Sequence, residues 1–166
     1  MIYQIVVTMK RQSLVRMHAV AGILAFCLIA SFFVCSLVSE IAGTLSWIVS
    51  VKKGIFYSMW AMLILLPTTV LTGTKLAGKS KDPIIAGKRK RLRWIAPNGV
   101  LLLTLASYLW YKANLGEFDS LFVAAQVLEF VVGLTNILLL GLMIRDGFRL
   151  KSNYQKPSRS TPKPAL

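Results

Sequence analysis

Four apolar stretches alternate with polar or basic segments along this chain of 166 residues. The stretches cover residues 17–39, 54–74, 94–111 and 121–144, and each holds 18 residues or more. A helix of about 20 residues, rising 1.5 Å per residue, crosses a hydrocarbon core roughly 30 Å thick. We therefore predict an all-α integral membrane protein, folded as a four-helix up-down-up-down bundle.

The segments around these spans have different characters. Residues 1–16 open with an apolar run too short to cross a membrane, and we expect a cytoplasmic or interfacial segment there. The transmembrane domain then covers 17–150, with a short outer connection at 40–53 and a basic polar loop at 75–93. Residues 151–166 are rich in Pro, Ser, Thr and Lys, which predicts a disordered cytoplasmic tail.

The basic residues are distributed unevenly between the two sides of the predicted bundle. Lys and Arg number three before the first span, eight in the loop 75–93 and six after the fourth span, against three in the outer connections. The positive-inside rule then places both termini and the loop in the cytoplasm. Because topology accounts for the net charge of +14, we expect no nucleic-acid partner. The lack of an amphipathic presequence favours a bacterial inner (plasma) membrane.

One stripe of polar residues follows the fourth predicted span. Gln126, Glu129, Gly133 and Asn136 are spaced by three, four and three residues, which places them on one helix face. Glu129 would lie near the middle of the bilayer, where a charge costs at least about 2.5 kcal/mol. Gln126, Glu129 and Asn136 form a candidate intramembrane site, either for a proton or cation or for hydrogen bonds that hold the bundle in register.

A second candidate polar site lies at the cytoplasmic ends of the first and third spans. His18 is the single histidine of the chain, and Asn98 is expected at the same membrane level. These residues could hydrogen-bond to each other, bind a quinone headgroup, or contribute to a haem site. No metal site is predicted, and Cys27 and Cys35 are too far apart along a helix to form a disulfide.

The strongest cluster of positive charge lies at the end of the predicted loop 75–93. It is a candidate contact for anionic lipid headgroups or for an acidic partner, and it consists of Lys88, Arg89, Lys90, Arg91 and Arg93.

No catalytic motif is found in the sequence, and we predict a protein that is not an enzyme and carries no cofactor. The first hypothesis is a subunit or assembly partner of a membrane complex, in contact with membrane lipids and with other membrane proteins or itself. The alternative is a small proton-coupled transporter that uses Glu129. A further alternative is a redox subunit that binds haem or quinone.

Overall fold

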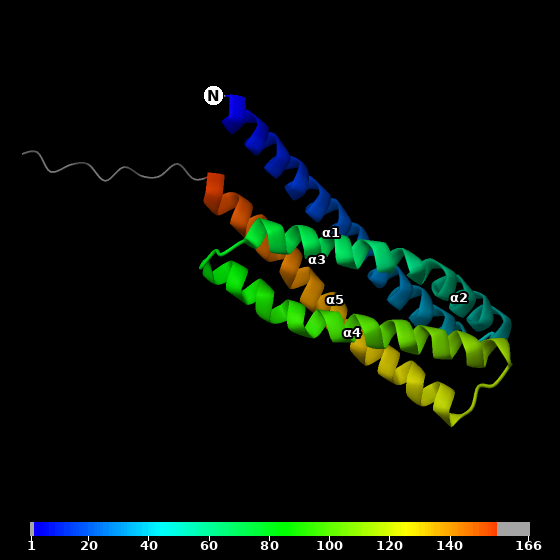
Figure 1. The fold of residues 1–166 in the computed structure, drawn as a ribbon. Coiled ribbons are helices and arrows are strands. Elements are labelled where there is room, and N and C mark those ends of the chain that lie inside the picture. Colours follow the sequence, from blue (N-terminus) through cyan, green and yellow to red (C-terminus); the bar gives the residue numbers. More distant parts are fainter. Residues whose placement is uncertain (1, 156–166) are drawn as a thin grey trace, which may run out of the picture.

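Helices account for nearly all of the described chain. The computed structural model describes the backbone of residues 2–155 and the side chains of 11–152, so predictions about residue 1 and residues 156–166 lie outside it. The elements are α1 (Ile2–Ala42), α2 (Leu45–Ser58), the 3₁₀ turn η1 (Met59–Ala61), α3 (Met62–Ala77), α4 (Pro83–Asn114) and α5 (Ser120–Gln155) (Figure 1). No strand occurs within residues 2–155, which confirms the all-helical prediction.

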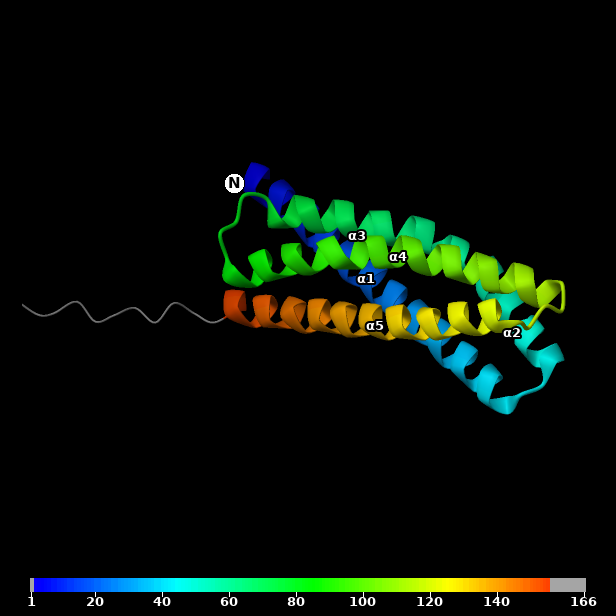
Figure 2. The ribbon, with the colours of Figure 1, turned by 90° about the horizontal axis from the view of Figure 1, so that it is seen from below.

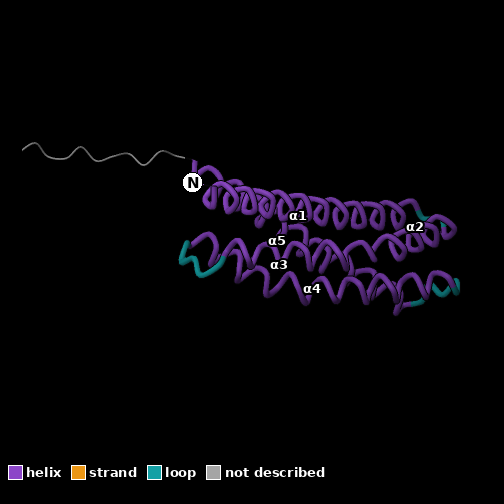
Figure 3. The backbone as a smooth tube through the Cα atoms, turned by 45° about the horizontal axis from the view of Figure 1, so that its top comes forward, coloured by secondary structure: helices purple, strands orange, loops and turns teal. Residues whose placement is uncertain are grey.

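The elements form four long helical segments, because α2, η1 and α3 follow one another without a break. Consecutive segments run in opposite directions, and the loops gather at the two ends of the molecule (Figure 3). The described ends of α1 and α5 lie at the same end as the loop between α3 and α4 (Figures 1 and 2). Helix α1 contacts α2, α3 and α5, and α4 contacts α2 and α5.

Glycines and capping residues define where the chain reverses. Gly43 and Gly116 have φ values of +74° and +72°, a left-handed conformation that glycine adopts without steric cost. Asp82 caps α4 by accepting a hydrogen bond from the Ile84 amide at 2.8 Å. Asp119 accepts one from the Phe122 amide at 2.9 Å and in this way caps the start of α5.

Two connections are much shorter than the sequence indicated. The predicted connection 40–53 is reduced to Gly43 and Thr44, because α2 already begins at Leu45. The predicted loop 75–93 is also reduced, here to residues 78–82, and the basic cluster after it belongs to α4. Lys and Arg are good helix formers, so a run of them continues a helix as readily as it interrupts one.

The outer segments are likewise more helical than expected. Helix α1 begins at Ile2, so the described part of the predicted segment 1–16 is continuous with the first apolar stretch. Helix α5 extends to Gln155, so residues 151–155 do not belong to a disordered tail.

Within the described residues, three helical segments are long and apolar enough to cross a membrane. They are Arg11–Ala42, Leu45–Ala77 and Ser120–Ser152. Helix α4 has sufficient length with 32 residues, but its first third is strongly basic and Pro97 and Asn98 interrupt its apolar part. These three segments indicate an integral membrane protein.

Candidate functional site

A buried lysine is the centre of the polar interior. Lys52 lies on α2, and only 1% of its side chain is exposed. Its Nζ atom donates hydrogen bonds to Ser36 Oγ on α1 at 2.6 Å, to Glu129 Oε2 on α5 at 3.1 Å, and to Gln126 Oε1 on α5. A single ammonium group therefore joins three helices.

Lys52 and Glu129 lie far from the ends of their helices. Lys52 follows the start of α2 by seven residues, and Glu129 follows the start of α5 by nine, so both lie about 10–14 Å along the helix axes. Charges at such depth among apolar side chains are expensive unless they are paired and hydrogen-bonded. The ion pair between Lys52 and Glu129 meets both conditions.

Ser36 and Gln126 complete the hydrogen bonds around the ion pair. The Ser36 hydroxyl donates to Glu129 Oε2 at 3.2 Å while it accepts from Lys52. The Gln126 amide nitrogen donates to Glu129 Oε2 at 2.9 Å and contacts Ser36 Oγ at 3.3 Å. Ser39, one turn further along α1, donates to the Ser36 carbonyl at 2.8 Å. Glu129 thus accepts from three donors on three helices.

A second acid lies beside the same lysine. Glu40 Oε1 is 3.8 Å from Lys52 Nζ, and this buried oxygen has no hydrogen-bond partner among the described residues. The early start of α2 brings Lys52 next to the Glu40 side chain, which is 23% exposed. Lys52, Glu40 and Glu129 together carry a net charge of −1 when all three are ionised. Binding of one proton therefore makes the site neutral.

A narrow cavity extends from this network along the bundle axis. Its volume is about 60 Å³, and its polar lining comes from Ser36, Glu129 and Asn136. All four helical segments contribute to its apolar walls, which include Phe32, Phe33, Ile55, Met59, Met62, Gly99, Ala106 and Phe130. Asn136 is fully buried, and neither polar atom of its side chain has a hydrogen-bond partner in the described part of the protein.

The polar stripe predicted from the sequence is divided by the structure. Gln126 and Glu129 meet in the network, whereas Asn136 lies seven residues further along α5 and faces the cavity. Lys52, Ser36 and Glu40 were not predicted as site residues. The second span was predicted to begin at residue 54, whereas the second helical segment begins at Leu45. With the earlier start, one buried face would have been indicated by the spacing of Ile48, Lys52, Ile55 and Met59.

His18 has partners other than the expected Asn98. Its Nδ1 atom lies 3.0 Å from the Thr69 carbonyl oxygen and 3.1 Å from Thr72 Oγ1, both on α3. Gly73 permits this approach, since a Cβ atom there would lie 2.9 Å from His18 Cε1. Among the described residues, no hydrogen bond joins His18 to Asn98, so the structure does not bring this predicted pair together.

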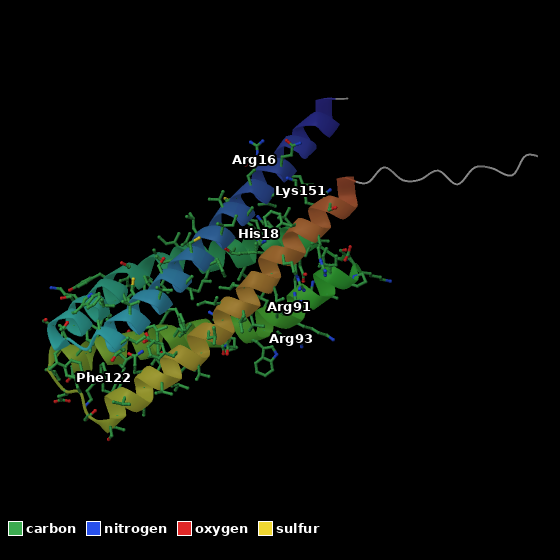
Figure 4. The ribbon with its side chains drawn as sticks, turned by 180° about the vertical axis from the view of Figure 1, so that it is seen from behind. Arg16, His18, Arg91, Arg93, Phe122 and Lys151 are labelled. Carbon is green, nitrogen blue, oxygen red and sulfur yellow. The ribbon has the colours of Figure 1, made fainter. Side chains whose placement is uncertain are left out.

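The basic cluster on α4 splits into paired and outward-facing residues. Arg91 donates to Asp146 Oδ2 on α5 at 2.5 Å, and Arg89 donates to the Gly78 carbonyl at 2.6 Å. Lys90 and Arg93 are exposed and border a surface recess together with Trp94 and Pro97. Figure 4 shows His18, Arg91 and Arg93 toward the end that holds Arg16 and Lys151, with Phe122 toward the opposite end.

Cys27 and Cys35 are free thiols, as their spacing on one helix predicted. In the part of the chain that the structure describes, no group of three or more His, Cys, Asp or Glu residues is placed to hold a metal ion.

Comparisons with protein-family models, with curated proteins and with solved structures find no match. The geometry of the buried network is therefore the basis for a function.

Proposed function

We propose that this chain is a small proton-coupled membrane carrier whose proton-binding site consists of Glu129, Lys52 and Glu40. The observation that carries the proposal is one fully buried ammonium group between two carboxyl groups. Ionisable groups at membrane depth are expensive to keep and commonly mark ion or proton pathways. The sequence alone favoured a subunit of a membrane complex. The finding of Lys52 and a second acid beside Glu129 shifts the preference to proton coupling.

The proposed topology has four crossings with both ends in the cytoplasm of a bacterial inner membrane. Three apolar segments, short loops at alternate ends and the packing of α4 against α2 and α5 support it. The predominance of Lys and Arg at the end with the 78–82 loop supports the orientation. In this arrangement Lys52 and Glu129 lie in the outer half of the bilayer.

Proton binding at this site would change how the helices are held together. A proton on Glu129 removes the charge that pairs with Lys52, and Glu40 then becomes the remaining counter-charge, with its Oε1 atom 3.8 Å from Nζ. The ammonium group needs to move by only about one ångström to reach hydrogen-bond distance from Glu40. Such a shift weakens the link between α2 and α5 and strengthens the one between α2 and α1. Protonation is thereby coupled to the packing of α5.

The proposal is tested by proton flux into proteoliposomes that contain a pH-sensitive dye, driven by an imposed membrane potential. Wild-type protein is expected to carry protons faster than protein-free liposomes. Glu129→Gln keeps the size and hydrogen-bonding capacity of the side chain but cannot bind a proton, so flux is expected to fall at least tenfold. Glu117→Gln makes the same change in the exposed loop before α5 and is the matched control, with wild-type flux expected.

Two results would contradict proton coupling. One is wild-type flux equal to that of empty liposomes, and the other is undiminished flux through a folded Glu129→Gln variant. Either result would favour the second candidate function, a subunit or assembly partner in which the network only holds helices together. The hydrogen bonds that join α1, α2 and α5 through Lys52 are the observation in favour of that candidate. Stoichiometric co-purification with a larger membrane complex would establish it.

The basic end of the bundle is proposed to contact anionic lipid headgroups. Lys90 and Arg93 face outward beside Trp94, which is 69% exposed. Cationic side chains next to an indole ring are typical of the membrane–water interface on the cytoplasmic side. This contact would anchor α4 and fix its depth relative to the site.

A further inference from the structure

The cavity beside Glu129 has polar groups at two levels and apolar walls between them. Glu129 and Ser36 lie at one level, and Asn136 lies seven residues further along α5, a distance of about 10 Å along the helix axis. Phe33, Met59, Met62 and Phe130 are among the side chains that surround the space. The cavity is therefore an elongated passage with few hydrogen-bonding groups.

Asn136 requires a partner that both donates and accepts hydrogen bonds. Its amide offers two N–H donors and a carbonyl oxygen, the side chain is 0% exposed, and the described residues supply no partner to either polar atom. Burying such a group without hydrogen bonds is unfavourable, especially at membrane depth where lipid offers none. Water meets the need because it donates and accepts equally well.

The size of the cavity decides between water and a larger ligand. A buried water molecule needs roughly 10–15 Å³ of volume measured in this way. The cavity of about 60 Å³ therefore has room for about four water molecules. Pockets for small organic ligands usually measure about 300–1,000 Å³. At an O–H···O spacing of about 2.8 Å, three waters with four hydrogen bonds span roughly 11 Å, so the cavity holds enough water to bridge the roughly 10 Å between Asn136 and Glu129.

We propose that this cavity binds a single file of water molecules, anchored by Asn136, that conducts protons to and from Glu129. This inference rests on the proposed function and names the transported species as the proton itself, since the passage is too narrow for a metabolite. The water at the Asn136 end accepts a proton from a hydronium ion on the cytoplasmic side. Each further water accepts a proton from its neighbour on the Asn136 side and passes a different proton onward. The file is thus unchanged except in orientation, and the Glu129 carboxylate becomes a carboxylic acid. Asn136 does not titrate and acts as a positioning residue.

Radiolytic hydroxyl labelling with mass spectrometry detects the waters without reference to proton flux, because side chains next to bound water are oxidised. Met59 and Met62 line the cavity and are only 5% and 4% exposed. Met143 packs against the same core, does not line the cavity and is more exposed than either residue, so it is the internal control for labelling by surface water. In full-length protein in lipid nanodiscs, Met59 and Met62 are expected to be labelled at least threefold more than Met143.

Variants that fill the cavity test the same point. Ala106→Leu places a larger side chain into the space and is expected to reduce labelling of Met59 and Met62 to the level of Met143. Gly99→Ala adds one methyl group at ordinary contact distance, 3.6 Å from Leu66 Cδ1, and serves if the leucine variant does not fold. Ala96→Leu is the matched control, because Ala96 lies on the exposed face of the same helix. Asn136→Leu is expected to reduce both labelling and proton flux at least fivefold.

The two proposals fail in distinguishable ways. Labelling of Met59 and Met62 no stronger than that of Met143, or labelling unaffected by both filling variants, would overturn the water file even if proton flux depends on Glu129. Strong labelling that Ala106→Leu abolishes, in a protein without proton flux, would support bound water and overturn the proton-carrier function and the conducting role of the file.

Discussion

Lys52 is the side chain on which the polar interior depends. Its ammonium group is the shared donor for Ser36, Gln126 and Glu129, and it lies beside Glu40. Removing one partner of a buried ion pair leaves the other charge uncompensated, which costs far more than the pair contributes as a whole. The interior is therefore sensitive to single substitutions and tolerant of paired ones.

Lys52→Met is expected to lower the free energy of unfolding by about 3–5 kcal/mol, because Glu129 and Glu40 lose their common counter-charge. Reversible unfolding in mixed micelles of mild detergent and SDS provides the measurement. Lys53→Met makes the same change at the exposed neighbouring position and is expected to have little effect. The double variant Lys52→Met with Glu129→Gln should lose less than the sum of the two single variants. Strict additivity would argue against the direct pair.

The sequence identified half of this site at the level of residues. Glu129 and Gln126 were predicted because an acid inside a long apolar run is conspicuous. Lys52 and Glu40 were missed because charged residues near the ends of apolar runs usually set topology. Here the apolar positions Ile48, Ile55 and Met59 continue on both sides of Lys52, and tertiary packing buries the lysine with them.

At the scale of elements, the existence of helices was predictable and their limits were not. Apolar runs mark where a helix meets lipid, but a helix continues into water wherever its polar residues are good helix formers. Residues 83–93, which include the basic cluster, illustrate this, since they extend α4 by about three turns beyond the apolar part. The short loops depend on Gly43, Asp82 and Gly116.

The loop between α4 and α5 gives a pH-dependent prediction. The hydrogen bond from the Lys112 ammonium at 2.8 Å, followed by that from the Phe122 amide, lowers the pKa of Asp119 below its ordinary value. A depressed pKa means that the ionised carboxylate stabilises the folded state. This contribution is fully present above the unfolded pKa of about 3.9 and is lost as the pH falls through the lower folded value.

Asp119→Asn retains a capping oxygen but removes the charge, so only the pH-dependent part is lost. At pH 7 the variant is expected to melt about 1–2 °C below wild type. The difference should persist down to about pH 5 and disappear once the pH has fallen below the lowered pKa of Asp119. Thermal unfolding followed by circular dichroism in detergent measures both proteins. A difference that is constant across this whole range would contradict the role of the charge.

For the whole molecule, the proposed orientation can be tested by accessibility of introduced cysteines. In a background with Cys27 and Cys35 changed to Ala, Glu117→Cys and Lys79→Cys place thiols in exposed loops at opposite ends of the bundle. In spheroplasts of an expressing bacterium, an impermeant maleimide is expected to label the cysteine at 117 directly. The cysteine at 79 should react only after permeabilisation, and the reverse pattern would invert the topology.

Helix α5 is longer than one membrane crossing requires. Helix α5 has 36 residues and is therefore about 54 Å long, whereas the hydrocarbon core is roughly 30 Å thick. The nine residues that follow Asp146, whose bond to Arg91 fastens α5 to α4, continue this helix for about 14 Å. A soluble domain fused after Gln155 through a continuous helix would therefore be held in a fixed orientation relative to the bundle. Such a fusion would give a membrane protein of 18.4 kDa a fixed marker for single-particle imaging.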